Sequence, residues 1–85
     1  MSATNPEQLN VVVPSLGWSE VQVSVWFAEL GDRVYEGDRL LELVAGGATF
    51  DVAAPATGRL TELTAFPRDV VQPGQVVGVV VADPE

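Results

Sequence analysis

Short runs of hydrophobic residues recur along the chain, and clusters of glycine, proline and polar residues separate them at intervals of about 8 to 12 positions. This spacing is typical of a β-sandwich or barrel, and little in the pattern favours a helix. We therefore expect six strands, at Asn10–Pro14, Glu20–Glu29, Arg39–Val44, Ala48–Ala53, Gly58–Leu63 and Val76–Val81.

Two of the expected strands have informative patterns. The strand at Glu20–Glu29 alternates between apolar and polar residues, which predicts one buried face. Its expected inward-facing residues are Val21, Val23, Val25 and Phe27, and its outward-facing residues are Gln22 and Ser24. The strand at Val76–Val81 is interrupted only by Gly78 and does not alternate. It is therefore interpreted as a strand that is covered on both sides.

The chain also contains an internal repeat. The segment DRVYEGDRLLEL, residues 32–43, matches DVVQPGQVVGVV, residues 69–80, at an offset of 37 residues. We expect the side chains of Asp32 and Asp69 to bond to nearby backbone N–H groups in turns, and we expect Gly37 and Gly74 to supply a positive φ. The motif PSLG, residues 14–17, matches PATG, residues 55–58, at an offset of 41, so the first half holds four extra residues in a longer loop or strand. Two like halves predict a quasi-two-fold structure.

The composition supports an all-β domain. The chain has 85 residues, of which 47% are hydrophobic and sixteen are valine. β-Branched side chains favour strands because a helix restricts their χ1 rotamers. A chain of this length supports one small core. We therefore expect one domain at residues 10–82, between a flexible N-terminal segment at 1–9 and a C-terminal tail at 83–85. The predicted fold is a sandwich of two antiparallel sheets.

The residue inventory argues against an enzyme. The sequence contains no cysteine, no histidine and no lysine. It therefore lacks a thiolate nucleophile, the usual general base near neutral pH and the commonest metal ligands. We expect no catalytic residue and no metal site. Several carboxylates do not follow the spacing of a calcium loop and are interpreted as a solvated surface: Glu20, Glu29, Glu36, Asp38, Glu42 and Asp51.

The formal net charge is −8 at pH 7, because twelve carboxylates outnumber four arginines. This charge disfavours nucleic acid and anionic membrane surfaces as partners and can steer the domain towards a basic protein surface. No apolar run approaches the ~20 residues that a membrane span needs, and the first ten residues contain no signal for export. We expect a cytoplasmic protein that is monomeric as an isolated domain. Arg33 and Arg39 are expected to form weak surface ion pairs with the nearby Glu36, Asp38 and Glu42.

In order and spacing, several segments resemble those of the biotinyl/lipoyl carrier domains, above all the lipoyl domains of 2-oxo acid dehydrogenase complexes. The resemblance extends from Val11 to about Val81. The matching segments are VVVPSLG, the strand that ends at Trp26 ahead of a Gly-Asp pair, GDRVYEGDRLLEL, ATFDVAAPATG and VVQPGQVVGVV. The resemblance implies a flattened barrel of two four-stranded antiparallel sheets with internal two-fold pseudosymmetry. It also implies that Trp26 packs inside.

The resemblance locates one departure from the family at a hairpin tip. Family members present Asp-Lys-Ala there, and lipoic acid acylates the lysine amine. Aligning the flanks of ELVAGGATFDV with that pattern places Gly46 on the aspartate, Gly47 on the lysine and Ala48 on the alanine. Glycine has no amine to acylate, and the sequence has no other lysine, so the resemblance implies that neither lipoyl nor biotin is attached. Gly-Gly also suits a two-residue type I′ turn, and it would let a partner's backbone approach closely.

A second departure lies in the loop after Gly17, which is shorter than in the family pattern. In the family this loop lies beside the attachment hairpin and helps partner enzymes to recognise the domain. Trp18 in this loop either covers the end of the barrel or anchors a partner. The candidate partner-binding residues are Trp18 and Ser19 in the loop and Ala45, Gly46, Gly47 and Ala48 at the tip.

Three hypotheses remain open on the sequence alone. The first is a lipoyl-like domain without its prosthetic group that serves as a non-catalytic binding or structural module. It would be related to the acyltransferase component of a 2-oxo acid dehydrogenase complex, with components of that complex as protein partners. The second is an acyl-carrier domain whose attachment site was lost or engineered away. The third is a cofactor-free, lipoyl-like spacer in an adaptor or transport assembly.

Overall fold

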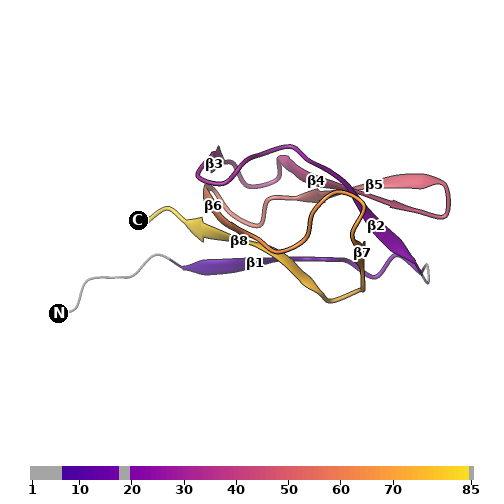
Figure 1. Ribbon diagram of the computed structural model, residues 1–85. Coiled ribbons are helices and arrows are strands. Elements are labelled where there is room, and N and C mark those ends of the chain that lie inside the picture. The colour runs from indigo at the N-terminus through magenta and orange to yellow at the C-terminus, as the bar shows by residue number, and fades with distance from the viewer. Residues whose placement is uncertain (1–6, 18–19, 85) are drawn as a thin grey trace.

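The computed structural model describes residues 7–17 and 20–84, and these residues form two four-stranded antiparallel sheets (Figure 1). In spatial order, the strands of the first sheet are β1 (Gln8–Val12), β8 (Val76–Ala82), β6 (Gly58–Leu63) and β3 (Arg33–Val34). The strands of the second sheet are β5 (Ala48–Ala53), β4 (Arg39–Ala45), β2 (Val21–Trp26) and β7 (Val70–Val71). The predicted all-β sandwich is confirmed.

Six of these strands correspond to the six expected ones. β5 and β6 have the expected bounds, and β4 extends one residue further, to Ala45. β1 begins two residues earlier than expected, and β2 ends at Trp26 instead of Glu29. The strands β3 and β7 were not expected, because two residues are too few to produce a recognisable alternation.

The alternation predicted for β2 is wrong beyond Val23. Val21 and Val23 are buried as expected, but Val25 and Phe27 are 39% and 43% exposed. The cause is a β-bulge between Val23 and Val25, at which Ser24 is the extra residue that has no partner on β4. A bulge adds one residue to one strand only, so the side chains that follow it change faces.

The bulge turns Trp26 towards the interior. Its side chain packs against the core, and its indole Nε1 donates a hydrogen bond to the carbonyl oxygen of Ala65 at 2.9 Å. The packing role expected for Trp26 is confirmed. In β8, the consecutive residues 77–80 are all buried, which agrees with the expectation of a strand covered on both sides.

The two halves of the chain are related by an internal pseudo-two-fold. Strands β1, β2, β3 and β4 correspond to β5, β6, β7 and β8. When each strand is exchanged with its counterpart, the strand order of one sheet becomes that of the other. Gly37 and Gly74 occupy equivalent turns, with φ of +90° and +85°. Asp32 and Asp69 also occupy equivalent turns, and each carboxylate accepts a hydrogen bond from the backbone N–H three residues earlier, at 2.8 and 2.9 Å. The repeat in the sequence therefore predicted the symmetry of the fold and the role of these four residues.

In the sequence, the four extra residues of the first half fall between the loop that contains Gly17 and the start of β2, because β2 and β6 begin equally far ahead of Asp32 and Asp69. The glycines of the two Pro-x-x-Gly motifs consequently differ in role. Gly17 lies in this loop with φ of +79°, and a Cβ built on it would meet no atom within 4 Å. Gly58 begins β6, and a Cβ there would lie 1.9 Å from the carbonyl oxygen of Val81.

The core lies between the two sheets. Its buried members in the described part of the chain are all apolar, and each large one contributes about 1.5–3 kcal/mol on burial. The largest of them that are almost fully buried are Leu40, Leu41, Leu43, Leu60, Val11, Val13, Val21, Val23, Val71, Val77 and Val80. These residues come from both sheets, so the interior holds the β4–β5 hairpin in a fixed position.

Candidate functional site

The β4–β5 hairpin extends to one end of the molecule and ends in a two-residue turn (Figure 1). Ala45 pairs with Ala48, and Gly46 and Gly47 between them have φ of +58° and +82°. Positive φ at both central residues is the requirement of a type I′ turn, whose twist matches that of the flanking strands. The tight Gly-Gly turn predicted from the sequence is confirmed.

The four candidate residues at the tip differ in exposure. Ala45 is 3% exposed and belongs to the core, so its side chain faces inward. Gly46, Gly47 and Ala48 are exposed. A Cβ built on Gly47 would meet no atom within 4 Å. The tip is therefore a surface of exposed backbone with one methyl group, and it offers contact but no reactive side chain.

Trp18 and Ser19, the other two candidate residues, lie outside the described residues. The segment that follows them reaches the tip end of the second sheet, because β2 begins at Val21 and Gln22 pairs with Val44. Val44 lies two residues before the turn. The residues just after position 19 and the hairpin tip therefore lie at the same end of the sandwich.

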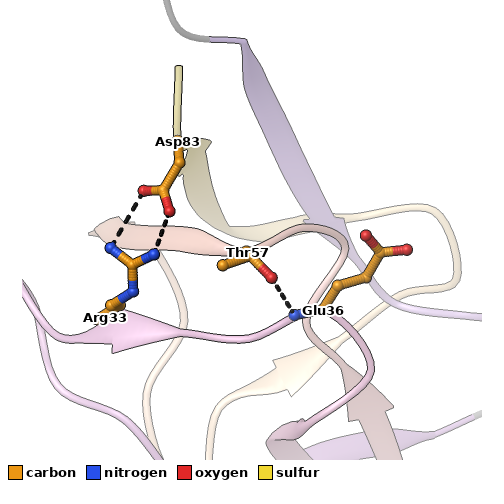
Figure 2. Close-up of polar contacts among 4 residues, drawn as sticks. All are labelled: Arg33, Glu36, Thr57 and Asp83. Carbon is orange, nitrogen blue, oxygen red and sulfur yellow. Dashed lines mark hydrogen bonds and ion pairs between the residues drawn. The ribbon is translucent and has the colours of Figure 1, made fainter. Parts of the chain in front are cut away.

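The end of the molecule opposite the tip carries a polar network that the sequence did not predict (Figure 2). Arg33 binds the carboxylate of Asp83 through both terminal nitrogens, and the N–H of Glu36 donates to the hydroxyl oxygen of Thr57 at 3.0 Å. The N–H of Asp83 also donates to the carbonyl oxygen of Thr57 at 2.9 Å. These bonds tie the segment after β8 to β3 and to the start of β6.

The ion-pair partners expected for the two arginines were wrong. Arg33 pairs with Asp83, which is 50 residues away in sequence, and Arg39 lies 3.9 Å from Asp51 on the neighbouring strand. The expectation used proximity in sequence, whereas strand pairing brings distant segments together. Fractional exposures of 36–63% for these side chains place both pairs at the surface, where they contribute little to stability.

No group of three or more carboxylates that could hold a metal ion occurs within residues 7–17 and 20–84. In the same residues, no helix is long and apolar enough to cross a membrane.

A two-fold β-sandwich with a hairpin turn at one end, and with its first and last strands paired, has the architecture of a biotinyl/lipoyl domain. The family model described as "Biotin-requiring enzyme" (Biotin_lipoyl) matches residues 9–80. The chain belongs to this family.

Among curated relatives, the chain is 38% identical over 72 residues to the "Dihydrolipoyllysine-residue succinyltransferase component of 2-oxoglutarate dehydrogenase complex" of Bartonella vinsonii subsp. berkhoffii, covering 82% of this chain and 18% of the relative. It is 35% identical over 63 residues to the "Lipoamide acyltransferase component of branched-chain alpha-keto acid dehydrogenase complex" of Pseudomonas aeruginosa, covering 74% of this chain and 13% of the relative. The chain therefore spans less than a fifth of the length of these relatives.

Solved structures support the fold. The lipoyl domain of the 2-oxoglutarate dehydrogenase complex from Azotobacter vinelandii matches with a TM-score of 0.73 at 18% identity, covering 91% of this chain and 99% of that domain. Urea carboxylase from Kluyveromyces lactis matches with a TM-score of 0.77 at 20% identity, covering 94% of this chain and 7% of that enzyme. At these identities, the likeness establishes a shared fold.

Proposed function

We propose that this chain is a lipoyl-like domain without a prosthetic group, which serves as a non-catalytic binding or structural module of a protein related to dehydrogenase-complex acyltransferases. We propose residues 10–82 as the domain and the cytoplasm as its setting. The relatives in the succinyltransferase and lipoamide acyltransferase components support the relation to these complexes. On this proposal, other components of such a complex are its protein partners.

The observation that carries the proposal is the Gly46-Gly47 turn in a sequence that contains no lysine. Family members carry lipoyl or biotin on a lysine, and the amide bond requires a nucleophilic nitrogen on a side chain. The position aligned with that lysine is Gly47, which has no side chain, and its neighbour Gly46 has none either. The residues at the tip therefore do not fit a covalently attached lipoyl or biotinyl group.

Intact mass spectrometry tests this proposal. The chain is co-expressed with a lipoate ligase and with a biotin ligase, beside a lipoyl domain that retains its lysine as a positive control. We expect an added mass on the control and none on this chain. A lipoyl or biotinyl increment on this chain would overturn the proposal.

The double variant Gly46→Asp, Gly47→Lys distinguishes a lost attachment site from a domain that partners no longer recognise. The open space around Gly47 accommodates a side chain without a clash. Positive φ would cost the new lysine about 1–2 kcal/mol, while aspartate tolerates this conformation better. Lipoylation followed by reductive acylation of the variant would show that recognition by ligase and dehydrogenase persists. A stable variant that remains unmodified would place the loss in the surrounding surface as well.

A further inference from the structure

The outer face of the second sheet carries exposed apolar side chains beside two carboxylates. Val25 and Phe27, which the bulge in β2 turns outward, are 39% and 43% exposed. Val25 pairs with Glu42 on β4, and Glu42 pairs with Asp51 on β5. Directly paired residues of an antiparallel sheet project from the same face. We call the surface formed by Val25, Phe27, Glu42 and Asp51 the acidic sheet face.

Of the two carboxylates of this face, only Asp51 has an ion-pair partner within the described residues. Glu42 and Asp51 lie directly opposite each other on neighbouring strands, an arrangement that destabilises a sheet when both are charged. Arg39 reaches Asp51 at 3.9 Å, and its guanidinium carbon lies 4.5 Å from the centre of the Phe27 ring. Within the described residues, no ion pair joins Glu42 to a cation. The face therefore retains negative charge next to apolar surface.

The pseudo-two-fold provides a matched face on the first sheet. There, the row that corresponds to Val25, Glu42 and Asp51 consists of Glu62, Val79 and Asn10. Thr64 occupies the position that corresponds to Phe27. The backbone N–H of Phe27 donates to the carbonyl oxygen of Leu40, and that of Thr64 donates to the carbonyl oxygen of the equivalent residue Val77, both at 2.9 Å. The same backbone thus carries one carboxylate and no aromatic ring. The first sheet therefore forms without paired carboxylates and without an exposed phenylalanine at the equivalent positions.

We propose that the acidic sheet face docks a basic, amphipathic segment of a protein partner. Apolar side chains of the partner cover Val25 and Phe27, and a lysine or arginine lies between Glu42 and Asp51. The net charge of −8 steers such a segment towards the domain, and the local carboxylate pair gives it a place to bind. This inference rests on the proposed function, because it treats the chain as a binding module, and it adds the chemistry of the partner.

The test is an NMR titration of the 15N-labelled domain with a synthetic helical peptide of leucine and lysine, with a leucine and glutamate peptide for comparison. We expect chemical-shift changes centred on β2, β4 and β5. The variant Glu42→Gln, Asp51→Asn should weaken binding about tenfold, because it removes two surface ion pairs. Phe27→Ser should weaken it as well. The matched control Glu62→Gln, on the first sheet, should change the dissociation constant by less than about twofold.

Several results would overturn the inference. The changes in shift could map to the first sheet, the acidic peptide could bind equally well, or Glu62→Gln could weaken binding as much as the double variant. Concentration-dependent shifts of the same face without peptide would assign it to a second copy of the chain and would also overturn it. Peptide binding by a domain that gains a lipoyl group would refute only the proposed function. An unmodified domain that fails to bind would refute only this inference.

Discussion

Arg68 and Gly31 occupy equivalent positions in the two halves and have the same backbone conformation. Their φ angles are +77° and +89°. Their backbone N–H groups donate equivalent hydrogen bonds to the neighbouring strand of the same sheet, Arg68 to the carbonyl oxygen of Val23 on β2 and Gly31 to that of Leu60 on β6, both at 2.8 Å. The second half therefore holds an arginine in a backbone conformation for which the first half uses glycine. This difference allows the energetic cost of positive φ at a residue with a side chain to be measured.

We expect Arg68→Gly to leave the domain as stable as the parent or to stabilise it by up to about 1.5 kcal/mol. The left-handed conformation costs a residue with a Cβ about 1–2 kcal/mol. Glycine removes that cost but gains about 0.4–1 kcal/mol of conformational freedom in the unfolded chain. The expected stabilisation is the difference between these two quantities. Gly31→Ala should have the opposite effect, because no atom lies within 4 Å of the added Cβ and only the positive φ opposes it.

Urea denaturation followed by tryptophan fluorescence measures the effect, with Arg68→Ala and Arg68→Asn as comparators. All three variants remove the same charge, so differences among them report on the backbone. The expected order of stability is glycine, then asparagine, then alanine, because asparagine tolerates positive φ better than alanine does. In a thermal melt of the same variants, each change of 1 kcal/mol in the free energy of unfolding should shift the melting temperature by roughly 4–8 °C in a domain of this size. An alanine variant as stable as the glycine variant would refute the reasoning.

Three further predictions concern stability. Gly58→Ala should destabilise the domain by about 3 kcal/mol or more, because its Cβ would overlap a backbone carbonyl oxygen 1.9 Å away, and an unchanged urea midpoint would contradict this. Asp32→Ala and Asp69→Ala should each cost about 1 kcal/mol and be additive in the double variant, as measured by thermal denaturation; a markedly non-additive result would show that the turns are coupled. Trp26→Phe should lower the free energy of unfolding by about 1 kcal/mol or more, because it removes the hydrogen bond to Ala65. Thermal melts followed by circular dichroism measure this loss, and an unchanged melting temperature would contradict it.

The sequence predicted those parts of the fold that depend on local chemistry. Glycines in turns, aspartates that cap turns and runs of valine each report on a few neighbouring residues, and the repeat of such signals at an offset of 37 residues revealed the pseudo-two-fold. The Gly46-Gly47 turn was predicted for the same reason, since two glycines between alternating strands strongly favour a tight hairpin.

Features that depend on strand register were not predictable in this way. The bulge at Ser24 reverses the faces of Val25 and Phe27, and no residue in that segment indicates where the extra residue falls. The acidic sheet face follows from that reversal and was therefore missed. The pairing of Arg33 with Asp83 was missed because it joins segments 50 residues apart. The binding roles of the tip residues and of Trp18 and Ser19 stay predictions.

The pairing of the first strand with the last has a consequence for rearranging the chain. Gln8 lies opposite Val81 in the β1–β8 ladder, as Thr49 lies opposite Val44 in the β4–β5 hairpin. A circular permutant that joins the end of β8 to the start of β1 with a short turn and opens the chain between Gly46 and Gly47 would begin with β5 and finish with β4. Because the two halves have the same topology, the permutant would trace the same path through the sandwich with the sheets exchanged. The hairpin tip and the paired outer ends of β1 and β8 are thus interchangeable as points of entry into one architecture.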